Sequence, residues 1–169
     1  DIEGIRLVKA KHGGAASARN MGAFATNAEI VAFIDSDCMP HDGWLSALVA
    51  PFEEEDVVGV GGTYKTLNPG STVAWLIGWE ISYHHSRFKR EISFIGSYSA
   101  AFKRADFVEI GGFDTEFTRA DSEDNDLSYR MNQRGKLIFA PDAWVDHKHP
   151  TSFFRYIKGQ YGRAYWRVL

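Results

Sequence analysis

The sequence has little cysteine, no surplus of basic residues and no long apolar run. Its single cysteine, Cys38, excludes an internal disulfide and fits a reducing compartment. The formal net charge is -3, so the chain lacks the basic character typical of nucleic-acid-binding domains. No apolar run approaches the about 18 residues that a membrane-spanning helix requires. These absences exclude a disulfide scaffold and argue against a nucleic-acid-binding or membrane-spanning protein.

What is present is the composition of a globular domain. The 169 residues suffice for one domain with a core, and 44% of them are apolar while 24% are charged. Residues 5–8 already read as a core strand, and no methionine precedes them. We therefore expect the chain to be a piece of a longer protein, with further sequence upstream.

Strand patterns alternate with helical patterns along the chain. The apolar run at residues 30–34 is rich in β-branched side chains and predicts a strand buried on both faces, as in a parallel sheet. Gly61-Gly62 is expected to end a strand over residues 57–60. Helices are predicted over residues 15–28, 44–54, 71–89, 103–110 and 122–134, and further strands over 5–8, 94–102, 137–139 and 144–145. This alternation predicts an α/β sheet.

Two carboxylates follow the predicted strand at residues 30–34. Asp35 and Asp37 lie two residues apart where that strand ends, and ligands of open α/β sheets bind outside the carboxyl ends of the strands. Carboxylate oxygens suit Mg²⁺ or Mn²⁺ held together with phosphate oxygens. The alternative is an Asx-type turn that only ends the strand. We favour a site for a metal ion and a diphosphate.

A predicted helix starts with four acidic side chains in six residues, 121–126. Acids in a first turn interact favourably with the helix dipole, and this explains Glu123. Asp124 shares a helical face with Leu127 and Met131, which should turn towards the core. A carboxylate at the inward edge of a helix start is a candidate general base. The pattern alone leaves the structural and the catalytic role of these acids open.

Two further segments carry side chains suited to ligands. His147, with His149 two residues on, follows a predicted strand and is a candidate metal ligand beside Asp37, although loop histidines are more often ordinary surface residues. Gly96 opens a segment of glycine and hydroxyl residues in which the backbone can approach a ligand closely. A β-bulge would explain that glycine equally well.

Residues 151–169 form a basic aromatic tail without an acid. Its basic side chains are Arg155, Lys158, Arg163 and Arg167. Such a composition suits a helix lying on an anionic lipid surface, and equally a helix docked on a further domain.

Taken in order, the motifs resemble those of a family 2 glycosyltransferase with the GT-A fold. Five segments carry the resemblance across nearly the whole chain, at spacings similar to the family's. They are residues 13–22 (GGAASARNMG), 30–37 (IVAFIDSD), 101–104 with 111–114 (AFKR and GGFD), 123–130 (EDNDLSYR) and 145–147 (VDH). The resemblance implies a Rossmann-like, mixed and mostly parallel sheet flanked by helices. Residues 1–150 would be a catalytic domain that is incomplete at its N-terminus, and residues 151–169 a C-terminal helix.

The resemblance also implies an activity: inverting, metal-dependent transfer of a sugar from a nucleotide-diphosphate donor to an acceptor hydroxyl. Asp124 is implied as the base, with Glu123 supporting it or the acceptor. Asp37 and His147 would hold the divalent ion, Mn²⁺ or Mg²⁺. The residues that we expect to bind the donor are Arg19, Asp35, Asp37 and Gly96.

The expected partners follow from the same resemblance. They are a nucleotide-sugar donor and a saccharide or lipid-linked acceptor, in the synthesis of cell-surface polysaccharide or glycolipid, and no nucleic acid. The family and the basic tail imply a cytoplasmic location with peripheral contact to the inner face of the plasma membrane. The family's opening strand and its nucleotide-gripping acids have no counterpart and should precede Asp1. Gln160 and Arg163 keep part of a Gln-x-x-Arg-Trp motif without its tryptophan, which favours transfer of a single sugar.

Two other functions compete with this interpretation. A haloacid-dehalogenase-type phosphatase also places Asp-x-Asp after a strand, but the following Cys38-Met39-Pro40 does not fit its motif. A non-catalytic sugar- or partner-binding module on the GT-A fold is the second alternative, because a fold does not prove an activity. The presence of both Asp37 and Asp124 argues against it.

Overall fold

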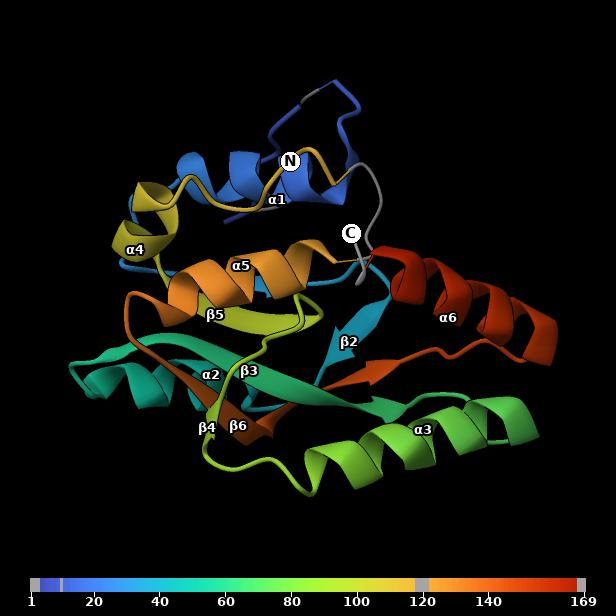
Figure 1. Ribbon diagram of the computed structural model, residues 1–169. Coiled ribbons are helices and arrows are strands. Elements are labelled where there is room, and N and C mark those ends of the chain that lie inside the picture. Colours follow the sequence, from blue (N-terminus) through green and yellow to red (C-terminus); the bar gives the residue numbers. More distant parts are fainter. Residues whose placement is uncertain (1–3, 10, 118–121, 167–169) are drawn as a thin grey trace.

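The computed structural model describes residues 4–9, 11–117 and 122–166, of which 162–166 are described by their backbone alone. A six-stranded sheet has the order β1-β5-β3-β6-β2, with β4 paired to β6 (Figure 1). The strands are β1 (Ile30–Ile34), β2 (Cys38–Pro40), β3 (Val57–Thr66), β4 (Glu91–Ile92), β5 (Ser99–Lys103) and β6 (Lys136–His147). The helices are α1 (Gly14–Phe24), α2 (Trp44–Val49), α3 (Thr72–His85), α4 (Arg104–Glu109), α5 (Glu123–Asn132) and α6 (Phe153–Trp166), and a 3₁₀ helix spans Ala50–Glu53.

The sheet separates two hydrophobic clusters. On one face, α1, α4 and α5 pack against the strands through residues such as Ala23, Phe107 and Leu127. On the other face, Leu48 of α2 packs against Val60 and other side chains of β3, β5 and β6. Figure 1 shows α1, α4 and α5 together on one side of the sheet. This layering explains the strand–helix alternation of the sequence.

The expected mixed α/β sheet is confirmed, but its described part is not mostly parallel. Only β3 and β6 pair in parallel, whereas β1–β5, β3–β5, β2–β6 and β4–β6 are antiparallel pairs. The reason is the position of β5. It lies between β1 and β3 and is antiparallel to both. The strands β1, β3 and β6 therefore run in the same direction, but only β3 and β6 are adjacent. A local hydrophobic pattern carries no information about such an inserted strand.

The prediction that β1 is buried on both faces is wrong. Val31 and Phe33 are buried, whereas Ala32 and Ile34 are exposed. The burial therefore alternates, as in a strand covered on one face only.

The predicted helices are confirmed, with shorter bounds at several ends. The helix predicted to reach residue 28 ends as α1 at Phe24, where the N–H of Ala25 donates to the Met21 carbonyl. The helix predicted to reach residue 54 ends as α2 at Val49 and continues as the 3₁₀ helix that contains Pro51, which has no N–H for an α-helical bond. Ser71 caps α3 by accepting a hydrogen bond from the N–H of Ala74.

Two strands are longer than the sequence suggested. The glycine pair Gly61-Gly62 does not end β3; a Cβ on Gly62 would lie 1.9 Å from the Ala143 carbonyl oxygen, so the glycine permits close approach of β6. The strands predicted on either side of Pro141 form one strand, β6. The proline lies at an irregularity between two stretches of regular pairing with β3, where its missing N–H breaks no ladder bond.

One predicted strand is not formed, and another is shorter than predicted. Residues 5–8 pair with no described strand, and Ile5 and Leu7 are 67% and 77% exposed. A strand needs a neighbouring backbone, and none of the described strands supplies one there. In the segment predicted as extended over residues 94–102, the strand begins only at Ser99, because residues 95–97 bond to α5 instead.

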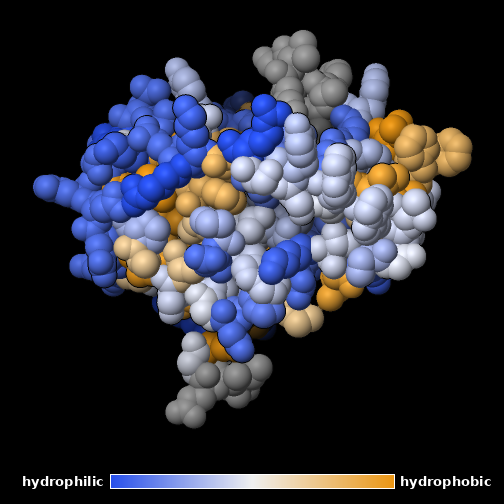
Figure 2. All heavy atoms as spheres, turned by 90° about the horizontal axis from the view of Figure 1, so that it is seen from below, coloured by the Kyte–Doolittle hydropathy of each residue, from blue (hydrophilic) through white to orange (hydrophobic). Residues whose placement is uncertain are grey.

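Exposed hydrophobic and aromatic side chains concentrate on α3 and α6. Trp75, Trp79 and Tyr83 of α3 and Phe154 of α6 are among them. Figure 2 shows the molecule from below. Orange and pale side chains lie among the blue ones towards the right, the side on which both helices begin in Figure 1. Among the described residues, no helix combines the length and apolarity that crossing a membrane requires.

Candidate active site

The predicted site residues lie where β1 ends, where α5 begins and where β2 runs beside the end of β6. A turn follows β1, in which the N–H of Cys38 donates to the Asp35 carbonyl at 3.0 Å. This turn places Asp37 directly before β2. The strand-ending turn considered as an alternative is therefore present, and the two carboxylates stand on it.

Arg19 joins the end of β1 to the start of α5. Its Nη2 donates to Oδ1 of Asp35 at 2.8 Å, and its Nη1 donates to Oε1 of Glu123 at 2.9 Å. Glu123 is 3% exposed, and the side chain of Arg19 is 15% exposed. A carboxylate buried to this degree is tolerated as an ion only with such a partner. The contact favours a positioning role for Glu123, because Arg19 already holds its carboxylate.

Asp124 is anchored through one carboxylate oxygen. Its Oδ2 accepts hydrogen bonds from the N–H of Ser97 at 3.1 Å and from the Ser97 hydroxyl at 3.3 Å. Its Oδ1 is buried and has no hydrogen-bond partner among the described residues. Leu127 and Met131 on the same face are buried as predicted, and Ser128 is buried beside them. One carboxylate oxygen is thus held in place, while the other has no hydrogen-bond donor. This arrangement is expected of a general base, whose second oxygen accepts the proton.

The environment of Asp124 also sets its proton affinity. Burial, and after it the charge of Glu123, raises the pKa of Asp124 to about 6. The hydrogen bonds from Ser97 and the charge of Arg19 act in the opposite direction but do not cancel the rise. A carboxyl group with a pKa near the working pH accepts protons more effectively than an ordinary aspartate and is still ionised at neutral pH.

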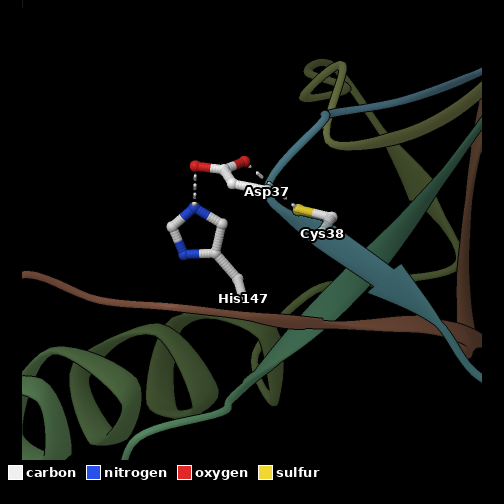
Figure 3. Close-up of side chains that lie close together, drawn as sticks. All are labelled: Asp37, Cys38 and His147. Carbon is white, nitrogen blue, oxygen red and sulfur yellow. Dashed lines mark hydrogen bonds and ion pairs between the residues drawn. The ribbon is translucent and has the colours of Figure 1, made fainter.

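Asp37 and His147 face each other across β2 and the end of β6 (Figure 3). The antiparallel register pairs Cys38 with His147, and Nε2 of His147 lies 3.6 Å from Oδ2 of Asp37. One ligand atom each of Asp37, Cys38 and His147 falls within 4.8 Å of the others. A carboxylate and an imidazole are ligands that Mn²⁺ accepts, so these side chains fit a divalent ion. The end of β6 thus lies where His147 can meet Asp37, and the metal site that the sequence suggested for this pair stays a prediction.

His149 lies beside this pair and is enclosed. It is 5% exposed, its Nδ1 lies 3.3 Å from Nδ1 of His147, and its Nε2 has no partner among the described residues. Burial, and then the neighbouring His147, lowers the pKa of His149 to about 4. His149 is therefore neutral at physiological pH, so it adds no positive charge to the metal site.

Gly96 has a packing reason to be glycine. A Cβ at this position would lie 2.3 Å from the ring of Tyr98, and the Gly96 carbonyl accepts a hydrogen bond from the N–H of Ser99. Gly96 precedes Ser97, the residue that anchors Asp124. Its contact with the donor stays a prediction.

Sequence reasoning missed three contributors to the site. Ser97 belonged to a segment singled out for its hydroxyls, but nothing in that pattern indicated Asp124 as its partner. Cys38 was considered for disulfides and for a phosphatase motif but not as a metal ligand, although its place after Asp37 was a usable signal. Tyr64 of β3, whose ring lies 5.4 Å from that of His147, carries no local motif at all.

Known proteins match nearly the whole chain. The model of glycosyl transferase family 2 matches residues 1–111. A pre-mycofactocin glycosyltransferase of Mycobacterium tuberculosis is 31% identical over 172 residues, covering 96% of this chain and 36% of the relative. A glucosyl-dolichyl phosphate glucuronosyltransferase of Haloferax volcanii is 29% identical, covering 80% of this chain and 48% of the relative. The chain therefore spans between about a third and a half of these relatives.

Solved structures match the fold. A structure of GalNAc-T7 with UDP, GalNAc and Mn²⁺ aligns with a TM-score of 0.62 at 20% identity, covering 81% of this chain and 31% of the other. The mannosyltransferase PcManGT of Pyrobaculum calidifontis, in complex with GDP-Man and Mn²⁺, aligns with a TM-score of 0.61 at 19% identity, covering 86% and 39%. At these identities the likeness concerns the fold. Together with the family match, it shows that the chain has the GT-A fold and belongs to glycosyl transferase family 2.

Proposed function

We propose that this chain carries the catalytic centre of an inverting glycosyltransferase that moves a sugar from a nucleoside-diphosphate donor to an acceptor hydroxyl. The observation that carries the proposal is Asp124, whose Oδ2 is anchored by Ser97 while its buried Oδ1 has no donor. Family membership supports the reaction class, and the relatives named above are sugar transferases by name.

The chemistry follows from the number of free carboxylates. In a single displacement, the acceptor oxygen attacks the anomeric carbon, its proton passes to a base, and the bond to the diphosphate breaks. Asp124 is placed to take that proton. Glu123 is held by Arg19 and so is not available as a nucleophile for a double displacement, which would need a second carboxylate at the sugar. Among the described acids at the start of α5, Glu123 and Asp126 are paired with Arg19 and Arg130, so Asp124 is the one left as a base, which favours inversion.

Asp37 and His147 would hold the divalent ion that this reaction requires. A metal ion bound there supplies positive charge to the departing diphosphate as a Lewis acid. The Mn²⁺ named in both structural relatives supports a divalent ion in this chain as well. Asp35 begins the turn that presents Asp37 and accepts a hydrogen bond from Arg19, so we assign Arg19 and Asp35 to the donor side of the site.

The stereochemical course of the reaction tests the proposal. We expect product formed by the full-length protein from an α-linked nucleotide sugar to carry a β linkage, read from the anomeric proton coupling in an NMR time course. Donor incubated without acceptor serves as the control, because its hydrolysis releases free sugar whose anomeric signals must be told apart from those of the new linkage. Retention of the α configuration would contradict the single displacement and the sole catalytic role of Asp124.

Some finer expectations stay predictions. The role in cell-surface polysaccharide or glycolipid synthesis, a lipid-linked acceptor and the cytoplasmic location rest on the resemblance alone. Contact of α6 with the inner membrane face is supported by the exposure of Phe153 and Phe154 and by Arg155 and Lys158 on the same helix.

A further inference from the structure

A cavity of about 360 Å³ opens beside the predicted metal ligands and is not needed for the donor-side contacts. It lies between α3, the ends of β3 and β6, and the first half of α6. Figure 1 shows α3 and α6 reaching past the sheet at this end of the molecule. Its volume falls in the range of about 300–1,000 Å³ that small-molecule sites occupy. Its polar lining includes Glu80, His84, His149, Arg155, Tyr156 and Gln160.

A chain of hydrogen bonds crosses this cavity from α6 to α3. Nε2 of Gln160 donates to the Tyr156 hydroxyl at 2.7 Å, and that hydroxyl donates to Oε2 of Glu80 at 2.8 Å. His149 lines the same cavity, and its buried Nε2 has no partner among the described residues. The lining therefore holds both donors and acceptors, and one enclosed polar atom lacks a partner. Such an atom costs free energy unless a ligand or a water molecule satisfies it.

The charges of the lining indicate an uncharged ligand. Arg155 supplies one positive charge and Glu80 one negative charge. A phosphate group would call for several basic side chains in bidentate or clustered arrangement. Ile77, Ile81 and Pro150 contribute apolar surface between the polar groups. Apolar surface with several hydroxyl-binding groups suits a sugar ring, which has apolar C–H faces and a rim of hydroxyls.

Contacts between aromatic rings connect the cavity to the proposed base. Tyr64 lines the cavity, and its ring lies 4.4 Å from that of Tyr98 in an edge-on arrangement. Tyr98 follows Ser97, which holds Asp124. His147 lines the same cavity and faces Asp37. A ligand in the cavity would therefore contact His147 of the metal-binding pair, and Tyr64 alone would separate it from Tyr98 in the segment that positions the base.

We infer that this cavity binds the acceptor, and that the acceptor presents a neutral saccharide ring there. The inference rests on the proposed function and names the substrate class of that site. Glu80 accepts hydrogen bonds from sugar hydroxyls, and the Tyr156 hydroxyl orients its carboxylate. Selectivity for neutral sugars follows, because Glu80 offers an acceptor to hydroxyl groups while the single Arg155 is no basic cluster for a uronic or sialic acid.

The test uses a microarray of neutral and anionic oligosaccharides. The full-length protein, saturated with a nucleoside diphosphate and Mn²⁺, is applied as wild type, Tyr156→Phe, Glu80→Gln and Tyr161→Phe. Tyr161→Phe is the matched control, because it makes the same change on the same helix at a side chain that is 76% exposed. We expect binding to neutral glycans to fall at least tenfold in Tyr156→Phe and Glu80→Gln and to stay unchanged in Tyr161→Phe.

A second readout separates this inference from the proposed function. Nucleoside-diphosphate affinity, measured by calorimetry, should be equal in all four proteins, and equal melting temperatures establish that the variants are folded. If wild type binds the nucleotide but binds no neutral glycan, or if both cavity variants bind glycans as wild type does, the acceptor assignment is overturned. If wild type binds no nucleotide at all, the proposed function itself has failed.

Discussion

Replacing Asp124 by asparagine is expected to lower kcat at least 1,000-fold, on the order of the upper part of the range for loss of a general base. The asparagine carbonyl can still accept the hydrogen bonds from Ser97, so the fold around it is kept. What is lost is the ability to take a proton. In the wild type, kcat/KM should rise with pH and level off above about pH 6, because only the ionised carboxylate is a base and the pKa of Asp124 in the free protein is raised to about 6.

The same variant should be more stable than wild type at high pH. The pKa of Asp124 rises on folding from 3.8 to about 6, which corresponds to about 3 kcal/mol. Below about pH 4 the carboxyl group is protonated in the folded and the unfolded chain, so its burial does not lower the free energy of unfolding. Between about pH 4 and 6 the unfolded chain loses its proton first, so the stability of the wild type falls as pH rises. Asparagine removes this cost, and urea denaturation at pH 8 and at pH 4 measures the difference.

Asp126→Asn is the matched control for Asp124→Asn. Asp126 is on the same helical turn and pairs with Nε of Arg130 at 3.0 Å, outside the site. This variant should keep the activity of wild type and lose less than about 1 kcal/mol of stability. Equal turnover by wild type and Asp124→Asn would show that Asp124 is not the base, whereas no turnover by a folded wild type would favour a non-catalytic binding module.

Arg19→Met is expected to destabilise the protein by about 3–5 kcal/mol at pH 8, as breaking one side of a buried ion pair does. Methionine keeps much of the length of the side chain but leaves the 3%-exposed Glu123 carboxylate without its donor. The variant should also lose nucleotide affinity, since Asp35 loses the same partner. The free energy of unfolding in urea and the nucleotide affinity are the two readouts.

A double-mutant cycle identifies the cause of that loss. Combining Arg19→Met with Glu123→Gln replaces the buried charge by a neutral amide, so the double variant should regain a large part of the stability that Arg19→Met alone loses. Arg134→Met is the control, because Arg134 also contacts two acids, Asp106 and Glu109, but at the surface. Such exposed pairs contribute about 0–1 kcal/mol. If Arg19→Met cost no more than Arg134→Met, the buried bridge would not support the site.

Local patterns in the sequence predicted the elements that present the site. A five-residue apolar run followed by two carboxylates placed Asp35 and Asp37 at the end of β1, and helical periodicity placed Asp124 on the inward face of α5. Both predictions need only neighbours in the sequence, because the period of a strand or a helix is a local property.

Other contacts of the site have no local signature. Arg19 and Glu123 are 104 residues apart, and neither position shows which partner the other meets. The strand β5 enters the sheet between β1 and β3 and reverses the pairing that a parallel sheet would have. Ser97 anchors Asp124 only because residues 95–97 lie against α5, which depends on packing of the whole domain. Each of these relations is set by tertiary structure, and propensity does not encode it.

Donor binding through Asp37 is the central claim, and calorimetry tests it most directly. A panel of nucleoside diphosphates is titrated with and without Mn²⁺ into the full-length wild type and into Asp37→Ala. We predict that one nucleotide binds in a Mn²⁺-dependent way and that Asp37→Ala weakens this binding at least tenfold, since the ion loses a carboxylate ligand. Binding that is independent of Mn²⁺ and unchanged in Asp37→Ala, or no nucleotide binding by a folded wild type, would contradict the account.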